Sequence, residues 1–185
     1  MSEIRGLVLE SRVEYVETRH GRNVWVNIVK SLPEPIGQAV GEQVFISNLY
    51  PFYLLKELDN AIGEVIQEPL EKLFKEIGAF HAGKIMDRYF FNYLDKRNPA
   101  GMLRQIKNLY GTLWNIGTCE VEENDSKNFT LSFHYKEDIY KSYCWFMQGF
   151  LSTSVEMCGG KAVRLSEGKC GAMDEDVCEY HLQWK

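Results

Sequence analysis

The chain has 185 residues, of which 45% are hydrophobic, and it carries a net charge of −5. This length suffices for one domain with a sizeable core, and the negative charge argues against the basic surface that duplex nucleic acid requires. No apolar stretch approaches the roughly 20 residues of a membrane-spanning helix, and the first residues lack the pattern of a secretion signal. We therefore expect a single cytoplasmic domain, residues 1–185, without a membrane span or a nucleic-acid partner.

The first 115 residues carry apolar side chains at helical spacing, interrupted by glycine and proline. The pattern predicts helices over residues 4–20, 23–32, 51–65, 69–95 and 99–113, with an irregular stretch or short helix over 34–48. The longest of these helices contains Gly78 and Gly83, each of which costs about 1 kcal/mol relative to alanine. Tight packing against another helix is the favoured explanation, and a ligand that approaches bare backbone is the alternative.

The second part of the chain changes to the alternating pattern of strands. Phe129, Leu131, Phe133 and Tyr135 alternate with polar residues, and a polar turn links this strand to one near residues 118–121. A helix over 138–157 and strands over 161–167 and 177–184 follow. We therefore expect an α+β fold in which a helical part, residues 1–115, packs on an antiparallel β-β-α-β-β unit, residues 116–185.

Three cysteines and a glutamate of the second part have the composition of a metal site. Cys144 lies in the predicted helix, Glu167 and Cys170 follow a strand, and Cys178 begins the last strand. Zinc binds thiolates and carboxylates tetrahedrally, and it stabilises a fold most when its ligands come from separate elements. Four protein ligands leave no position for water, which predicts a structural site. Buried cysteines without an ion are the alternative.

Other candidate ligands are excluded by geometry. Cys158 follows Cys144 by fourteen residues, which is roughly 20 Å along one helix. His181 is three residues after Cys178, and an odd separation in a strand places the two side chains on opposite faces. Cys119 and Cys158 are interpreted as small buried hydrophobic residues. An odd number of cysteines without a secretion signal also favours thiols or metal over disulfides.

The spacing of Cys144, Glu167, Cys170 and Cys178 resembles the vinyl-reductase-like (4-vinyl reductase) domain of phenol- and aromatic-sensing transcription activators. This resemblance implies that the four matching residues bind a structural zinc. The opening of the chain, residues 6–11 and then 20–25, is similar to the start of haem-NO/oxygen-binding domains. Both families share one fold with the Bet3-type subunits of the TRAPP vesicle-tethering complex, so the resemblance implies N-terminal helices followed by a β-β-α-β-β unit.

Two departures from the haem-binding relatives concern their cofactor. Those proteins use an axial histidine on the helix before the first hairpin, whereas this chain has no histidine between His81 and His134, and Leu103 matches the axial position. Their Tyr-x-Ser-x-Arg motif, which binds the haem propionates, corresponds to the more acidic stretch 133–138. We therefore expect no conventional haem and no axial haem residue. His81 is interpreted as a hydrogen-bonded core histidine, with an atypical haem site as the alternative.

The favoured hypothesis is a ligand sensor that binds a small apolar or aromatic molecule, acts on a signalling partner and forms a homodimer. Its predicted pocket contains Tyr89, Phe90, Tyr93, Trp114 and Phe146, all of which core packing would also explain. The alternatives are a TRAPP-like interaction scaffold and an atypical haem or tetrapyrrole sensor. No catalytic residues are predicted, because the chain shows no acid–base pair, activated nucleophile or dinucleotide fingerprint.

Overall fold

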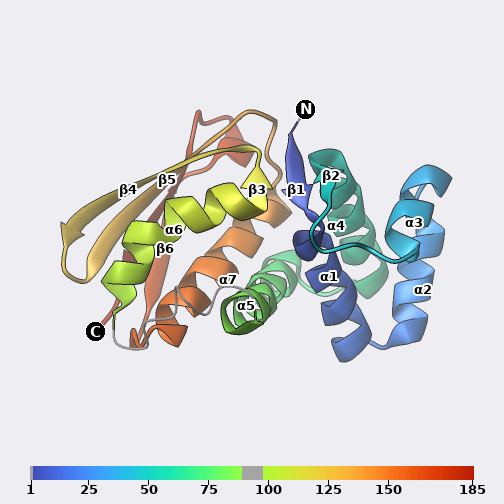
Figure 1. Cartoon of the computed structure of the whole chain (residues 1–185), viewed down its shortest axis with the longest axis horizontal. Helices are drawn as coiled ribbons and strands as arrows, with labels where there is room; N and C mark the ends of the chain where they lie inside the picture. The colour runs from blue at the N-terminus through green and yellow to red at the C-terminus, as the bar shows by residue number, and fades with distance from the viewer. Residues whose placement is uncertain (1, 89–97) are drawn as a thin grey trace.

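The computed structural model describes residues 2–88 and 98–185. Helices α1 (Gly6–Arg19), α2 (Arg22–Ser31), α3 (Glu34–Gly41) and α4 (Phe52–Ile66) form one side of the molecule (Figure 1). Helix α5 (Leu70–Arg88) lies between these helices and the sheet-containing half that the rest of the chain builds (Figure 1). Helix α3 lies within the stretch 34–48, for which the sequence predicted an irregular segment or a short helix. None of the described helices is long and apolar enough to cross a membrane.

A small antiparallel sheet joins the two halves. It consists of β1 (Glu3–Arg5), β2 (Leu49–Pro51) and β3 (Trp114–Asn115) in the order β2-β1-β3. The expected helix over residues 4–20 was therefore wrong at its start, since Ile4 lies in a strand, fully buried, opposite Tyr50 and Trp114. Strands of two or three residues show no period in the sequence, and their partners are distant along the chain.

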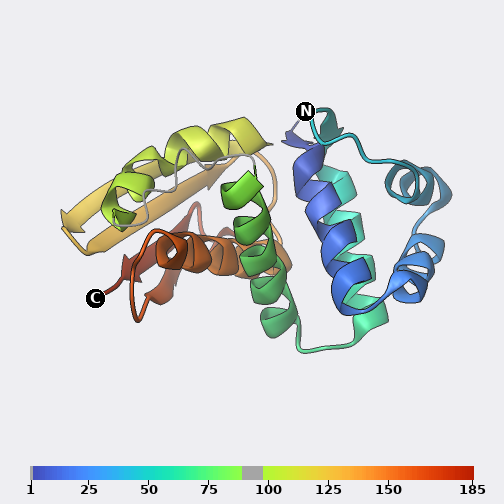
Figure 2. The same ribbon diagram turned by 60° about the horizontal axis from the view of Figure 1, so that its bottom comes forward.

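The second sheet is the β-β-α-β-β unit that the alternation predicted. Strands β4 (Gly117–Asp125), β5 (Asn128–Tyr135), β6 (Arg164–Lys169) and β7 (Cys178–Gln183) are antiparallel in the order β4-β5-β7-β6. One face is apolar, and it packs against α6 (Pro99–Leu113) and α7 (Lys141–Met157) (Figure 2). Helix α6 begins at Pro99, preceded by Asn98, whose side chain accepts a hydrogen bond from the backbone N–H of Gly101 at 2.7 Å. The α+β fold class is thus confirmed.

Helices α5 and α7 pack with their backbones in close contact. A Cβ atom on Gly78 of α5 would lie 2.0 Å from the carbonyl oxygen of Phe146, and one on Gly149 of α7 would lie 2.0 Å from that of Lys75. Neither position has room for a side chain. The expectation of tight helix packing is confirmed at Gly78, and it does not extend to Gly83, where no described atom lies within 4 Å of the added Cβ.

We expect Gly149→Ala to lower the free energy of unfolding by about 1–3 kcal/mol, because the methyl group forces the two helices apart. The matched control is Gly111→Ala on α6, where no described atom lies within 4 Å. This control should be neutral or stabilising by up to about 1 kcal/mol, since alanine is the better helix former. Urea denaturation of both variants measures their free energies of unfolding. Equal changes in the two variants would contradict the close contact between α5 and α7.

Candidate functional site

The thiols of Cys144, Cys170 and Cys178, called the thiol cluster below, meet in the interior. Cys144 Sγ lies 3.7 Å from Cys178 Sγ and 3.6 Å from Cys170 Sγ, and all three sulfur atoms are within 4.8 Å of one another. They come from α7, from the residue before the 3₁₀ turn Gly171–Met173, and from β7. Three convergent buried thiols form a group that could hold a metal ion.

Glu167 lies beside the thiol cluster but is not a member of the three-residue group. Its Oε2 accepts a hydrogen bond from Lys141 Nζ, and the same nitrogen lies 3.3 Å from Cys170 Sγ. Its Oε1 is buried without a hydrogen-bond partner among the described residues. The carboxylate is thus connected to the sulfur atoms through Lys141, with one oxygen left free.

The environment of the thiol cluster favours negative charge on one sulfur. A hydrogen bond from Cys144, aided by the backbone N–H of Gly171 at 3.1 Å, lowers the pKa of Cys178 to about 7 although burial opposes this. The hydrogen bond to Cys178, and then burial, raise the pKa of Cys144. Cys178 is therefore the first of the pair to become the thiolate that a metal ion requires.

The residues that the sequence excluded as ligands lie outside the thiol cluster. Cys158 is fully buried at the C-terminal end of α7, and Cys119 is buried on β4. His181 is exposed on the opposite face of β7 from Cys178, where its Nδ1 lies 3.2 Å from Thr130 Oγ1. The described cysteines are all free thiols.

A cluster of rings fills the space between α5, α7 and the sheet. We call His81, Tyr110, Trp114, Tyr143, Phe146 and Phe150 the aromatic interior; each is at most 2% exposed. The centroid of the His81 ring lies 5.2 Å from that of Phe146 and 5.7 Å from that of Trp114. The predicted pocket residues Trp114 and Phe146 therefore lie together, whereas Tyr89, Phe90 and Tyr93 fall outside the described residues.

The hydrogen bonds of Ser11 serve to assign the tautomer of His81. The Ser11 hydroxyl has one hydrogen, and it lies 2.9 Å from the carbonyl oxygen of Val8, to which it donates. Ser11 Oγ also lies 2.6 Å from His81 Nδ1, so we assign the ring proton to Nδ1 on the basis of this network. His81 Nε2 is consequently an unprotonated acceptor, and it is buried without a partner among the described residues.

The buried position of His81 predicts a pH dependence of stability. Burial, and then the charge of Arg12, hold its pKa well below the ordinary value of 6.5. Below that value the unfolded chain binds a proton that the folded chain does not, so the free energy of unfolding falls by about 1.4 kcal/mol per pH unit as the pH drops. Urea denaturation between about pH 6.5 and pH 5 should show, in His81→Leu, a pH slope of the free energy of unfolding that is shallower by up to this amount. The exposed His134→Leu control should keep the original slope, and identical slopes in all three proteins would contradict the burial of a neutral His81.

An ion pair that the sequence reasoning missed lies against the aromatic interior. Arg12 and Asp59 are at most 1% exposed. Arg12 Nε donates a hydrogen bond to Asp59 Oδ1 at 2.8 Å. The Tyr140 hydroxyl donates to the other oxygen, Asp59 Oδ2, also at 2.8 Å. The guanidinium carbon of Arg12 lies 4.1 Å from the centroid of Phe146. In the sequence, Arg12 lies within the apolar stripe of α1 and Asp59 within that of α4. These two charged residues were the features that could have indicated a buried ion pair. The pair connects α1 and α4 to α7.

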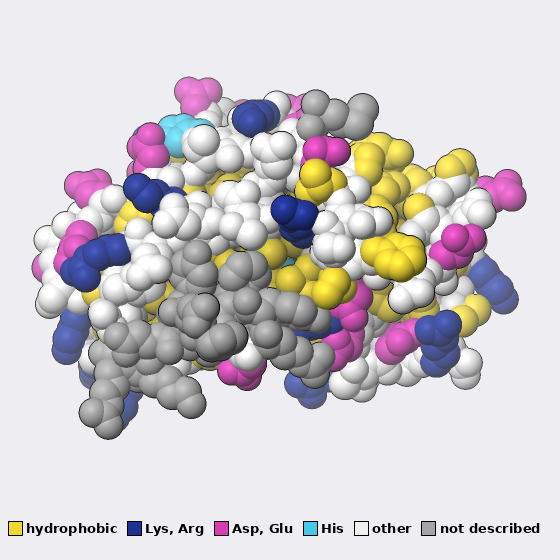
Figure 3. Space-filling model, in the orientation of Figure 1, with side chains coloured by type: hydrophobic (Ala, Val, Ile, Leu, Met, Phe, Trp, Pro, Cys, Tyr) yellow, Lys and Arg dark blue, Asp and Glu magenta, His cyan; other side chains and the backbone are white. Residues whose placement is uncertain are grey.

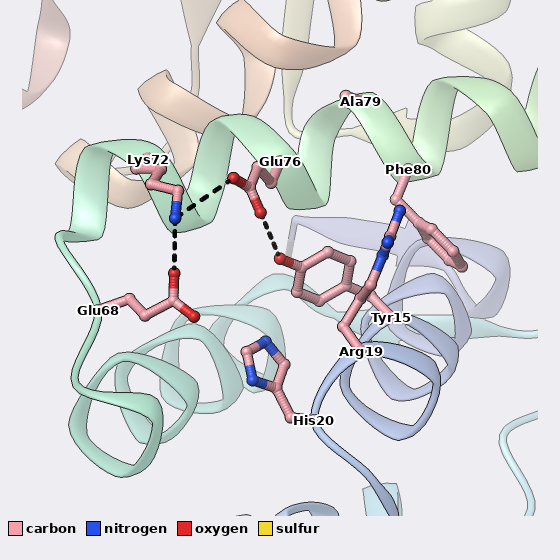
Figure 4. A pocket seen from close by; sticks show the side chains of 8 residues that line it. All are labelled: Tyr15, Arg19, His20, Glu68, Lys72, Glu76, Ala79 and Phe80. Atoms are coloured by element: carbon pink, nitrogen blue, oxygen red, sulfur yellow. Dashed lines mark hydrogen bonds and ion pairs between the residues drawn. The ribbon is translucent and has the colours of Figure 1, made fainter.

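A surface groove of about 610 Å³ lies between the end of α1 and α5 (Figure 4). Several of its polar groups pair with one another: the Tyr15 hydroxyl donates to Glu76 Oε2 at 3.1 Å, and Lys72 Nζ lies 3.3 Å from Glu68 Oε2. The groove is lined by Tyr15, Arg19, His20, Glu68, Lys72, Glu76, Ala79 and Phe80. Most of this lining is polar, so the groove does not match the predicted aromatic pocket.

Comparison with solved structures identifies the class of fold. An H-NOX protein from S. oneidensis in the Fe(II)NO ligation state superposes with a TM-score of 0.77 at 14% identity, covering 98% of this chain and 99% of that one. The Fe(II) unliganded H-NOX protein from K. algicida gives 0.74 at 16% identity, covering 98% and 97%. The fold is thus that of the H-NOX domains.

The family model described as haem-NO-binding matches residues 5–163, and the chain therefore belongs to this family. Haem-NO-binding proteins are sensor domains and not enzymes, and the chain, as a member of this family, is not expected to be an enzyme. A 3-dehydroquinate synthase from Thermoanaerobacter sp. (strain X514) is 35% identical over 77 residues, 40% of this chain. The chain spans about a fifth of that enzyme (21%), so the match does not carry its activity.

The family holds haem, and two features of this chain bear on that cofactor. Helix α6 carries no histidine, and Leu103, which the sequence analysis matched to the axial position, is fully buried among apolar side chains. Rings occupy the region behind α6: Tyr110 stacks on Trp114 with centroids 5.2 Å apart, and Trp114 contacts Phe150 at 5.5 Å.

Proposed function

We propose that this chain is a small-molecule sensor domain whose aromatic interior binds a small aromatic molecule that carries a hydroxyl group. The observation that carries the proposal is the Nε2 atom of His81, which is fully buried, is assigned as an acceptor from the contact of Nδ1 with Ser11, and has no partner among the described residues. A buried acceptor without a hydrogen bond costs about 1–3 kcal/mol. A ligand hydroxyl would donate to this nitrogen, while Trp114 and Phe146 would contact the ligand ring.

The same residues argue against conventional haem. Leu103 offers the iron no ligand, and Lys136 and Glu137 follow β5 in the region where the haem-binding relatives have the arginine of their propionate motif. Haem with His81 as an unusual ligand is the second candidate, because an imidazole whose Nδ1–H is hydrogen bonded and whose Nε2 is free has the form of a metal ligand. A visible Soret band in the purified protein would favour this second candidate.

Titration calorimetry with phenol tests the first candidate. Wild-type protein should bind phenol, and His81→Leu should bind it at least tenfold more weakly because the acceptor is gone. His134→Leu, an exposed histidine on the same chain, is the matched control and should bind normally. Absence of phenol binding by a folded wild-type protein, or equal binding by the His81 variant, would overturn the proposal.

The second part of the proposal is a structural zinc held by Cys144, Glu167, Cys170 and Cys178, as in the vinyl-reductase-like domains that the spacing resembles. Three convergent thiols support it, and so does Oε1 of Glu167, which has no hydrogen-bond partner among the described residues and is available as the fourth ligand. Lys141 would partly neutralise the negative charge that three thiolates and a carboxylate bring to one ion. Free cysteines suit a reducing compartment, as expected for a cytoplasmic protein.

The third part is a homodimer that transmits the signal to a partner protein. Figure 3 shows hydrophobic side chains gathered over the N-terminal half, in the region of β2 and α4. One stretch of chain supplies four exposed apolar residues, Phe45, Ile46, Leu49 and Tyr53, with exposures of 39% to 54%. Light scattering should give the mass of two chains for wild type and of one chain for Leu49→Glu. A monomeric wild type would contradict the proposed dimer. This result would not distinguish the sensor from the TRAPP-like scaffold.

A further inference from the structure

Four basic residues lie together at one end of the second sheet. The backbone N–H of Lys185 donates to the carbonyl oxygen of Lys161 at 2.8 Å, so these two lysines are opposite each other on neighbouring segments. Lys127, in the turn that joins β4 to β5, lies on the other side of the last strand, because its carbonyl oxygen accepts from the N–H of Trp184 at 3.3 Å. Arg164 begins β6, shortly after Lys161. We call these exposed residues, Lys127, Lys161, Arg164 and Lys185, the basic cluster, and Figure 3 shows Lys and Arg side chains at this end of the molecule, where Figure 1 marks the C-terminus.

Acidic residues do not balance the charge of the basic cluster. None of its four side chains forms an ion pair within residues 2–88 and 98–185. Asp125, at the end of β4, is one carboxylate against four cations, and its oxygens accept hydrogen bonds from the backbone N–H of Lys127 and from the side chain of Asn128. Like charges that face each other on neighbouring strands destabilise a sheet, and Lys161 and Lys185 are such a pair. A chain with a net charge of −5 thus concentrates positive charge here, which attracts anions.

A hollow of about 330 Å³ opens beside the basic cluster. In the register of β6 and β7, Arg164 lies opposite Gln183 and Ser166 lies opposite His181, so these four residues share one face of the sheet. His181 is already paired with Glu179 at 3.2 Å, and Arg164 is therefore the free cation of the hollow. The polar lining contains hydrogen-bond donors and no carboxylate: Asn124, Asn128, Arg164, Ser166, His181 and Gln183. Guanidinium, amide and hydroxyl donors around a hollow of this size suit a small oxyanion.

We infer that this end of the sheet binds a small molecule that carries two or more phosphate groups. Arg164 would hold one phosphate in the hollow, because a guanidinium donates two parallel hydrogen bonds to phosphate oxygens. The three lysines would hold the second phosphate by charge. Each phosphate brings a charge of about −1.5 to −2 at pH 7, so two of them match four cations. Duplex nucleic acid fits less well, since it requires a longer basic stripe.

The inferred phosphate site is independent of the proposed sensor site. The aromatic interior and the thiol cluster are part of the hydrophobic core, whereas the basic cluster is exposed to solvent. A phosphorylated ligand would therefore bind whether or not phenol occupies the interior. The variant His81→Leu should bind phosphate compounds as wild type does, and this comparison separates the two proposals.

Titration calorimetry with pyrophosphate and inorganic phosphate tests the inference. We expect wild-type protein to bind pyrophosphate at least tenfold more tightly than inorganic phosphate, with an affinity that falls as salt is added. Arg164→Gln and the double variant Lys161→Gln/Lys185→Gln should each bind pyrophosphate at least tenfold more weakly. Arg22→Gln, which removes an exposed arginine of α2, is the matched control and should bind normally.

The ligand-free protein provides a second measurement. The melting temperature of Lys161→Gln/Lys185→Gln should not fall below that of wild type, because the variant removes a like-charge pair. Equal affinities for the two phosphate probes, unchanged binding by the variants, or no binding of pyrophosphate at millimolar concentration would each overturn the inference. Sedimentation with vesicles that contain phosphatidylinositol bisphosphate distinguishes the sources of phosphate. Binding to these vesicles without binding to pyrophosphate would assign the basic cluster to a membrane surface and would also overturn it.

Discussion

Replacing both Cys170 and Cys178 with serine is expected to remove zinc from the protein and to lower its melting temperature by on the order of 10 °C. The two residues lie on either side of the 3₁₀ turn and approach Cys144 of α7, so one ion would hold three elements together. An ion present at about a thousandfold excess over its dissociation constant adds about 4 kcal/mol to the free energy of unfolding. For a chain of this size each 1 kcal/mol corresponds to roughly 2–4 °C.

The measurement is elemental analysis of freshly purified protein together with a thermal melt. Cys119→Ser is the matched control, because this thiol is buried on β4 outside the thiol cluster. We expect the control to keep its zinc. Metal content and melting temperature that are the same in the double variant and in wild type would show that the three thiols are simply packed together.

Replacing Arg12 with methionine is expected to lower the free energy of unfolding by about 3–5 kcal/mol, because the variant leaves the carboxylate of Asp59 buried with only Tyr140 as a partner. The double variant Arg12→Met/Asp59→Leu should recover much of this loss, since it removes both charges and fills the space with apolar atoms. Urea denaturation of the two variants gives the comparison.

The exposed pair of Arg104 and Glu123 provides the control for the buried one. Arg104 Nη2 lies 2.7 Å from Glu123 Oε1 at the surface, and Arg104→Met should leave stability almost unchanged because water solvates the remaining carboxylate. A single Arg12 variant as stable as wild type would mean that Asp59 is not held as a buried anion. A double variant less stable than the single one would mean that the pair itself stabilises the fold.

Local pattern was enough to predict the second sheet and the residues of the thiol cluster. The alternation along Phe129, Leu131 and Phe133 identifies a strand with one buried face, and this face does pack on α6 and α7. The odd separation of Cys178 and His181 placed them on opposite faces of β7, as the structure has them. In contrast, the strand at residues 3–5 was missed, because three residues carry no period and its partners are more than forty residues away.

The hydrogen-bond partners of the polar groups in the interior could not be predicted from the sequence pattern. The sequence predicted that His81 is a core histidine, but it could not show that Ser11, seventy residues earlier, lies 2.6 Å from its Nδ1. Likewise, only the structure brings the rings of Tyr110, Tyr135 and Tyr143, which come from three different elements, into one cluster around Phe133.

The sequence by itself determined the α+β class and the change from helices to strands near residue 115, because both depend on the period of nearby apolar residues. It also identified the cysteines of the thiol cluster, because their chemical type and spacing indicate a metal site. Only the tertiary structure decided which polar atoms remain unpartnered, that Arg12 and Asp59 pair, and that Gly78 and Gly149 bring two helices into backbone contact. The physical reason is that hydrogen-bond satisfaction and close packing depend on atoms contributed by distant segments, whose positions are fixed only when the whole chain has folded.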